Sequence, residues 1–353
     1  MLSKFRAFCR KKDVEISLRR YGIDALGAMA QGLFCSLLIG TILDTLGSQL
    51  GIPMLEEIGS FASAMSGAAM AIAIGYALKA PPLVLFSLAA VGYASNQAGG
   101  AGGPLSVLII AILSAEVGKL VSKETKVDLL VTPLVTILLG CALSMWWAPA
   151  IGRAAKSVGT LINMATVLQP FWMGMVVSVL VGIALTLPIS SAAICHAITI
   201  AGLAGGAAVA GCCAQMVGFA VMSFRENRWG GLVSQGIGTS MLQMGNIVKN
   251  PRIWIPPILT SAITGPLATC LFHLEMNGDA VAAGMGTCGF VGQIGVYTGW
   301  VRDMEAGVKA AITSWDWAGL ILICFVLPAV ICPLLGLLLR KLGWIKEGDL
   351  KLD

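Results

Sequence analysis

The sequence consists mainly of apolar runs of about 20 residues, which is the length a helix needs to cross the hydrocarbon core of a bilayer. Short charged or Gly-rich segments separate these runs. Charged residues make up only 12% of the 353 residues and hydrophobic residues 57%, whereas soluble domains carry about 25% charged residues. So few charges cannot cover a water-facing surface. We therefore predict an all-α polytopic membrane protein with about ten transmembrane helices.

Clusters of Lys and Arg set the expected orientation, because such clusters are retained on the cytoplasmic side. The basic segment 1–24 is expected in the cytoplasm, bound to anionic lipid headgroups rather than to nucleic acid. If successive spans alternate in direction from there, all of the remaining basic clusters lie in the cytoplasm, as does the tail 346–353. We expect a multi-pass protein of the bacterial inner membrane with both termini inside.

The runs group into two predicted bundles. The predicted segments are a first bundle at 25–149 with a broken helix near 94–104, an interfacial amphipathic helix at 150–168, and a second bundle at 169–345. Two spans of the second bundle, 171–187 and 189–203, are separated only by Pro188.

Two stretches of the second bundle, 230–250 and 280–300, are too polar and Gly-rich to span. The topology closes only if the first stretch turns back from the cytoplasm and the second from outside, as two re-entrant hairpins. Gly236-Ile237-Gly238-Thr239 in the first matches Gly284-Met285-Gly286-Thr287 in the second. Related segments entering from opposite faces indicate an inverted repeat and an elevator-like transporter.

The hairpin tips are the predicted solute site. Glycine lets a ligand approach the backbone, and the main-chain groups freed there need polar partners. Hydroxyls and amides suit a neutral hydroxylated solute or a carboxylate. The candidate substrate-binding residues are Gly238, Thr239, Ser240, Gln243 and Asn246 in the first hairpin, Gly286, Thr287 and Gln293 in the second, and Asn96, Gln97 and His196 elsewhere. The alternative is that the glycines pack helices and the polar groups cap one another.

Other polar residues leave alternatives open. Asn96 and Gln97 either face the same cavity or cap a broken helix, and His196 either serves binding or proton relay or bonds a neighbouring carbonyl. Glu116 is expected to pair with Lys119 at i,i+3. Most of the ten Cys lie in apolar runs without metal-ligand spacing, so no metal and no cofactor is expected. No nucleophile–base pair is recognisable, so we expect no enzyme.

At the hairpins the sequence resembles a known family. The motifs are Gly238-Thr239-Ser240-Met241-Leu242-Gln243, Asn246-Ile247-Val248-Lys249-Asn250-Pro251, Ile253-Trp254-Ile255-Pro256-Pro257 and Gly286-Thr287-Cys288-Gly289-Phe290-Val291-Gly292-Gln293. They are similar to those of phosphotransferase-system EIIC-like membrane proteins, a group that includes the PfoR-type regulators. The resemblance implies the membrane subunit of a sugar transporter, with phosphorylation left to separate EIIA and EIIB proteins. Ser240 stands where glucose-type EIIC proteins carry Glu.

The resulting hypothesis is a permease that moves a small polar solute by alternating access, with a sugar or a sugar-like or carboxylate compound as cargo. We expect a homodimer, because a moving unit needs a fixed partner. The alternative function is a non-transporting membrane sensor or regulator of the PfoR type.

Overall fold

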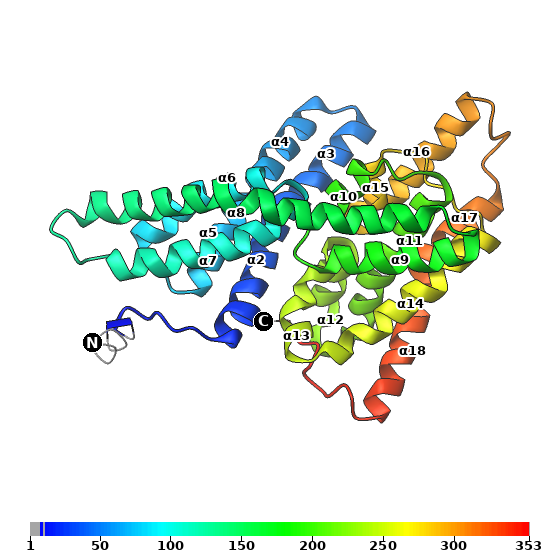
Figure 1. Cartoon of the computed structure of the whole chain (residues 1–353). Coiled ribbons are helices and arrows are strands. Elements are labelled where there is room, and N and C mark those ends of the chain that lie inside the picture. The colour runs from blue at the N-terminus through cyan, green and yellow to red at the C-terminus, as the bar shows by residue number, and fades with distance from the viewer. Residues whose placement is uncertain (1–7, 10, 353) are drawn as a thin grey trace. The chain divides into compact units, whose positions relative to one another are not determined.

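The computed structural model describes residues 8, 9 and 11–352, and within them it contains helices and no β-strand. The chain divides into two compact units, Met1–Ala154 (unit 1) and Ala155–Asp353 (unit 2). Figure 1 shows the helices of both units. The boundary falls inside the segment expected to form a separate interfacial helix.

Helices long and apolar enough to cross a bilayer are present in both units. Six of the described helices meet this condition, or up to seven if the bent pair Pro53–Ala64 and Ser66–Ala77 forms one span. The six are Arg20–Leu50, Pro82–Val121, Asp128–Thr166, Gly202–Met222, Pro251–Leu271 and Ser314–Lys341. The expected helical membrane protein is therefore confirmed, whereas ten spans are not.

Unit 1 is a bundle of packed helices. Its helices are α2 (Ala25–Leu33), α3 (Ile39–Leu50), α4 (Pro53–Ala64), α5 (Ser66–Ala77), α6 (Pro82–Gly99), α7 (Gly103–Val121) and the first part of α8 (Asp128–Thr166). Glycines allow close packing: a Cβ on Gly92 of α6 would lie 2.2 Å from the carbonyl oxygen of Gly67 on α5. Small residues at helix contacts are typical of membrane bundles.

The predicted broken helix near 94–104 is a tight turn between two helices. α6 continues regularly to Gly99, so the break is shorter than expected. Gly100 takes a left-handed φ of +51°, which favours glycine. α7 then packs back along α6, and a Cβ on Gly99 would lie 2.6 Å from the Ser106 hydroxyl oxygen. The continuous Pro82–Val121 stretch is thus two antiparallel helices.

α8 is one helix of 39 residues, where the sequence predicted a span followed by a separate helix at 150–168. At 1.5 Å per residue it is about 58 Å long, well beyond the hydrocarbon core of about 30 Å. Pro149 lies inside it. The first part of α8 packs in unit 1, where the Ser144 hydroxyl lies 2.7 Å from that of Ser95 on α6.

A cluster of charges, buried at Glu116 and Lys119 and exposed at Asp13, holds the segment before α2 in unit 1. The ammonium group of Lys119 lies 2.8 Å from the Glu116 carboxylate, and Lys119 is only 2% exposed. Lys119 also donates to the Asp13 main-chain oxygen at 2.8 Å. Arg20 pairs with the Asp13 carboxylate at 2.7 Å, and Tyr21 donates to Glu116 at 3.1 Å. The predicted pair of Glu116 and Lys119 is confirmed.

Unit 2 is built around α11 (Gly202–Met222), which is buried along most of its length. Its other elements are α9 (Pro170–Thr186), α10 (Ser191–Ala197), α12 (Phe224–Val233), η4 (Ser234–Gly238), η5 (Ser240–Gln243), α13 (Met244–Lys249), η6 (Pro251–Trp254), α14 (Ile255–Pro266), η7 (Leu267–Leu271), α15 (Ala280–Ala283), η8 (Cys288–Phe290), α16 (Val291–Glu305), α17 (Ser314–Ile321), η9 (Leu322–Val326) and α18 (Leu327–Lys341). A Cβ on Gly211 of α11 would lie 1.9 Å from the Ser178 carbonyl oxygen on α9, and one on Gly265 of α14 would lie 2.1 Å from that of Gly174. Three backbones are therefore in direct contact.

The predicted span 189–203 is wrong. The helix there is Ser191–Ala197, about 10 Å at 1.5 Å per residue, and Gly202 already begins α11. α9 runs parallel to α11, because Ser178 lies at Gly211 while Gly182 lies at Gly211 and Gln215. The chain must therefore return from the middle of α11 to its start at Gly202. α10 lies in this return and packs against α15.

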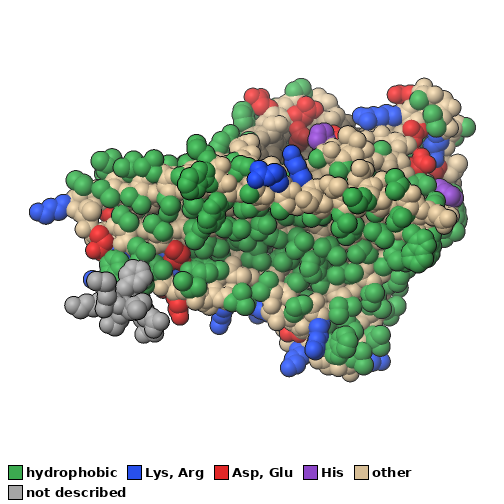
Figure 2. All heavy atoms as spheres, viewed as in Figure 1, with side chains coloured by type: hydrophobic (Ala, Val, Ile, Leu, Met, Phe, Trp, Pro, Cys, Tyr) green, Lys and Arg blue, Asp and Glu red, His purple; other side chains and the backbone are tan. Residues whose placement is uncertain are grey.

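Hydrophobic side chains cover the outside of unit 2. Phe171 and Trp172 on α9 and Leu259 and Ile263 on α14 are each more than 40% exposed. Figure 2 shows hydrophobic side chains gathered over α9 and α14, with charged side chains nearer the margins. This surface is suited to contact with lipid.

Candidate functional site: two hairpin tips at the middle of α11

The first hairpin comprises α12, η4, η5 and α13. It starts at the C-terminal end of α11, where the Gln235 amide donates to the Ser223 hydroxyl at 2.9 Å. It then runs back along α11, so that a Cβ on Gly236 would lie 3.4 Å from that of Ala220. Thr239 has an extended backbone at the turn, and its hydroxyl accepts from the Met241 amide.

The second hairpin comprises α15, η8 and α16 and starts at the opposite end of α11. Gly202, the first residue of α11, exchanges main-chain hydrogen bonds with Met276. A Cβ on Gly286 would lie 2.6 Å from that of Cys212. The Thr287 hydroxyl donates to the Met216 sulfur at 3.6 Å. α11 is about 31 Å long at 1.5 Å per residue, and the two hairpins meet near its middle, where η4 packs against η8.

A buried polar network joins the first tip to neighbouring helices. The hydroxyl oxygens of Thr186 and Ser240 lie 2.8 Å apart. Thr186 also donates to the Gln215 side-chain oxygen at 3.3 Å, and the Trp254 indole N–H donates to the same oxygen at 2.8 Å. Thr186, Ser240 and Gln215 are fully buried. Burial makes each lost partner expensive, so this network fixes the tip.

The second tip carries a buried acceptor without a partner. Gln293 is 8% exposed, and its Nε2 donates to Cys213 Sγ at 3.2 Å. Its Oε1 has no hydrogen-bond partner in the structure. Thr287, fully buried nearby, has only a weakly accepting thioether sulfur as its partner. Leaving a buried acceptor without a hydrogen bond costs the folded protein about 1–3 kcal/mol of stability. A hydroxyl or N–H of a bound solute would supply the missing bond.

The second tip is also strained. Gly286 and Gly289 have left-handed φ values of +56° and +52°, which glycine adopts freely. Phe290 has a φ of +60°, which is costly for a bulky side chain. Such strain persists where the surrounding structure imposes it and is concentrated at functional sites.

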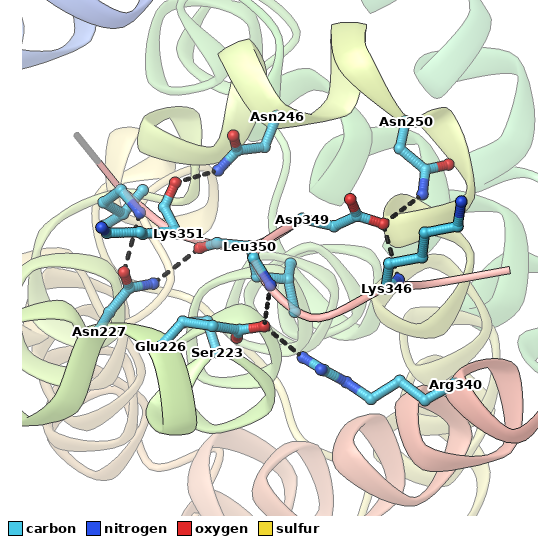
Figure 3. A network of polar contacts seen from close by, with 12 residues as sticks. Ser223, Glu226, Asn227, Asn246, Asn250, Arg340, Lys346, Asp349, Leu350 and Lys351 are labelled. Carbon is cyan, nitrogen blue, oxygen red and sulfur yellow. Dashed lines mark hydrogen bonds and ion pairs between the residues drawn. The ribbon is translucent and has the colours of Figure 1, made fainter. Parts of the chain in front are cut away.

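Gln243 and Asn246 do not lie at the tip. The Gln243 amide donates to the main-chain oxygen of Leu350 at 3.0 Å and to Gln235 at 2.9 Å. The Asn246 amide donates to the main-chain oxygen of Lys351 at 2.8 Å and to Gln243 at 2.8 Å (Figure 3). Their donors are thus filled by the chain itself.

The remaining candidates lie apart from the hairpin tips. Asn96 is in unit 1, where its amide donates to the Ser66 hydroxyl at 3.2 Å and its Oδ1 would be 2.3 Å from a Cβ on Gly103. These contacts place Asn96 against α5 and the start of α7, and neither is a side-chain cap of a helix. Gln97 is exposed on α6, and His196 is exposed on α10. Gly238, Thr239, Ser240, Gly286, Thr287 and Gln293 are the candidates that lie on the two hairpins at or near their tips.

Sequence reasoning missed Thr186, Trp254 and Ser261, which support the first tip from α9, η6 and α14. Thr186 and Ser261 are ordinary hydroxyls in apolar runs. Trp254 lies in one of the motifs quoted above, but nothing in that motif indicates its contact with Gln215. Over residues 8, 9 and 11–352, no group of three or more His, Cys, Asp or Glu side chains could hold a metal ion.

Comparison with known proteins decides the family. The family model described as "Phosphotransferase system, EIIC" matches residues 23–352. The chain belongs to the phosphotransferase-system EIIC family. No curated protein and no solved structure matches it. EIIC domains are permease components, and other subunits carry out phosphoryl transfer. With its apolar helices, this EIIC protein is an integral membrane transporter of the phosphotransferase type.

Proposed function

We propose that this EIIC protein binds a small polar solute between its two hairpin tips and moves it by alternating access. The observation that carries the proposal is the unpartnered Oε1 of Gln293, buried where η8 meets η4. Main-chain breaks at bilayer depth occur where protein or a wet cavity satisfies the freed groups. The strained backbone around Phe290 supports the same position for the site.

The tips favour a neutral, hydroxylated solute. The tip segments 234–240 and 284–293 contain hydroxyls and amides but no Lys, Arg, Asp or Glu. A carboxylate would be buried there without a cation, which is costly. A sugar or sugar-like compound can donate to Gln293 Oε1 and exchange hydrogen bonds with the Thr287 hydroxyl.

Charge supports the proposed orientation. At the C-terminal end of α11, Arg340 pairs with Glu226 at 2.8 Å and Arg252 stacks on Trp344 at 5.3 Å. Basic residues are retained in the cytoplasm, so the first hairpin would enter from the cytoplasm and the second from outside. α9 and α10 would form a third re-entrant hairpin. This hairpin replaces the two predicted spans 171–187 and 189–203, so the N- and C-termini of the chain still lie on the same side of the membrane.

In this elevator-like proposal, unit 2 carries the solute and unit 1 supplies the scaffold and the interface of a homodimer. The donor of the phosphoryl group would be separate EIIA and EIIB proteins, as in the family. A non-transporting regulator remains the second candidate. Uptake of a labelled sugar into proteoliposomes separates the two candidates.

The site is tested by binding. Purified protein in detergent is screened by thermal shift against sugars, sugar acids and small carboxylates, because a ligand that binds the native state raises Tm. Affinity for the best ligand is then measured for Gln293→Ala and Thr287→Val. Losing one hydrogen bond should weaken binding about tenfold.

Gln97→Ala is the matched control, since it removes an exposed amide in unit 1. Its affinity should equal that of the unmodified protein. Undiminished binding by both tip variants would remove the site assignment.

A further inference from the structure

The segment Lys346–Leu352, which we name the strap, lies across the first hairpin. The main-chain oxygen of Leu350 accepts from the Asn227 amide at 2.8 Å and from the Gln243 amide at 3.0 Å. That of Lys351 accepts from the Asn246 amide at 2.8 Å. Asn227 is on α12, Gln243 on η5 and Asn246 on α13, so the strap connects both arms of the hairpin (Figure 3).

Further bonds hold the strap at both ends. The Gly348 N–H donates to the Glu226 carboxylate at 3.3 Å, and the same oxygen pairs with Arg340. The Leu352 N–H donates to the Asn227 side-chain oxygen at 2.8 Å. Asn250, just after α13, donates to the Asp349 carboxylate at 2.8 Å. Most of these bonds use the main chain of the strap.

The strap is held mainly by polar contacts and buries little apolar surface. Leu350 is its one fully buried side chain, whereas Lys346, Glu347, Gly348 and Lys351 are exposed. The bond from Gln243 is buried and those from Asn227 and Asn246 are partly buried, and each contributes a net of about 0.5–1.5 kcal/mol. With Leu350 as its one buried apolar side chain, the segment adds little hydrophobic stabilisation to these bonds. Such a segment is released at lower free energy than a packed helix.

We propose that the strap is an internal ligand that holds the first hairpin closed. While it is bound, it fills the donors of Gln243 and Asn246 and ties α12 to α13. Its release leaves each amide with one hydrogen bond, from Gln243 to Gln235 and from Asn246 to Gln243, and removes the link that the strap makes between the two arms. The loss of this link loosens the tip that carries Ser240. The effect on transport rests on the proposed function; the effect on the hairpin does not.

The strap is tested by hydrogen–deuterium exchange of the full-length protein in lipid nanodiscs, without any solute. Gly348→Pro is the first variant. Gly348 has a φ of +92° and donates its N–H, whereas Pro fixes φ near about −65° and has no N–H. Removal of residues 346–353 is the second variant and abolishes the strap. Lys351→Ala is the matched control, because only the main chain of Lys351 binds the hairpin.

We expect amides in 234–249 to exchange about tenfold faster in both variants, with α11 unchanged and Lys351→Ala like the unmodified protein. Hairpin exchange that is unchanged after removal of the strap would overturn the proposal. Loss of the folded protein on removal would also overturn it, because the segment would then belong to the core of unit 2. Absence of solute transport would leave the exchange result intact and would count only against the proposed function.

Discussion

The hydroxyls of Thr186 and Ser240 lie 2.8 Å apart and join the end of α9 to the tip of the first hairpin. Thr186→Val keeps the side-chain shape but leaves the buried Ser240 hydroxyl without this partner. We expect a loss of about 1–3 kcal/mol in the free energy of unfolding. Thr186→Ser, which retains the hydroxyl, is the control. Unfolding in mixed micelles measures both, and equal stability would mean that the pair does not hold the tip.

Gly211 and Gly27 make a matched pair of glycines inside helices. Gly211→Ala would place a Cβ 1.9 Å from the Ser178 carbonyl oxygen, whereas a Cβ on Gly27 meets nothing within 4 Å. Overpacking should destabilise Gly211→Ala by about 1–3 kcal/mol or more. Gly27→Ala should stabilise by about 0.5–1 kcal/mol, because Ala is the better helix former. A Gly211→Ala protein as stable as the original would contradict the close contact of α9 and α11.

Lys119 is a buried cation whose removal should be severe. Lys119→Met leaves the buried Glu116 charge without its nearest partner, so we expect a loss of about 3–5 kcal/mol. Lys123→Met, at an exposed position just after α7, should change stability by less than about 0.5 kcal/mol. Adding Glu116→Gln to Lys119→Met should recover part of the loss. No recovery in the double variant would argue against an uncompensated carboxylate as the cause.

Asp13 should make the segment before α2 sensitive to acid. The hydrogen bond from Arg20 holds the pKa of Asp13 below its ordinary value of 3.8. A carboxyl with a lower pKa in the folded state adds stability above the unfolded pKa, and that contribution is lost as the pH falls through the folded value.

The measurement is the difference in the free energy of unfolding between the original protein and Asp13→Asn from about pH 3 to pH 6. It should be constant above about pH 5 and shrink below about pH 4. A difference that stays constant to pH 3 would show that Asp13 does not titrate with folding.

The turns within 230–250 and 280–300 could be anticipated from sequence because their composition excludes a regular span, whereas their re-entrant placement in a membrane stays a prediction. The stretches around Gly238 and Gly286 carry too many polar and Gly residues for a lipid-facing helix. The span predicted at 189–203 was wrong because its apolar composition was taken as evidence of contact with lipid. An apolar composition does not reveal whether lipid or protein covers a segment, and here Ser191 donates to the Gly284 main chain instead.

Gln243 and Asn246 illustrate a second limit. Their amides predicted hydrogen bonds to a ligand. In the structure these amides instead donate to the main-chain oxygens of Leu350 and Lys351. More than 100 residues separate donor and acceptor, since Gln243 lies 107 residues before Leu350. No local pattern carries a pairing over that separation, which depends on how α18 returns the chain to α12.

The α9 backbone touches that of α11 at Ser178 and Gly211 and that of α14 at Gly174 and Gly265, with no side chains between them. Sliding one of these helices past another would drive carbonyl oxygens into α-carbons, and no rotamer change could relieve the clash. We therefore expect the three helices to move as one rigid body. Any change of shape during a transport cycle has to be concentrated in the irregular π- and 3₁₀-helical turns around it.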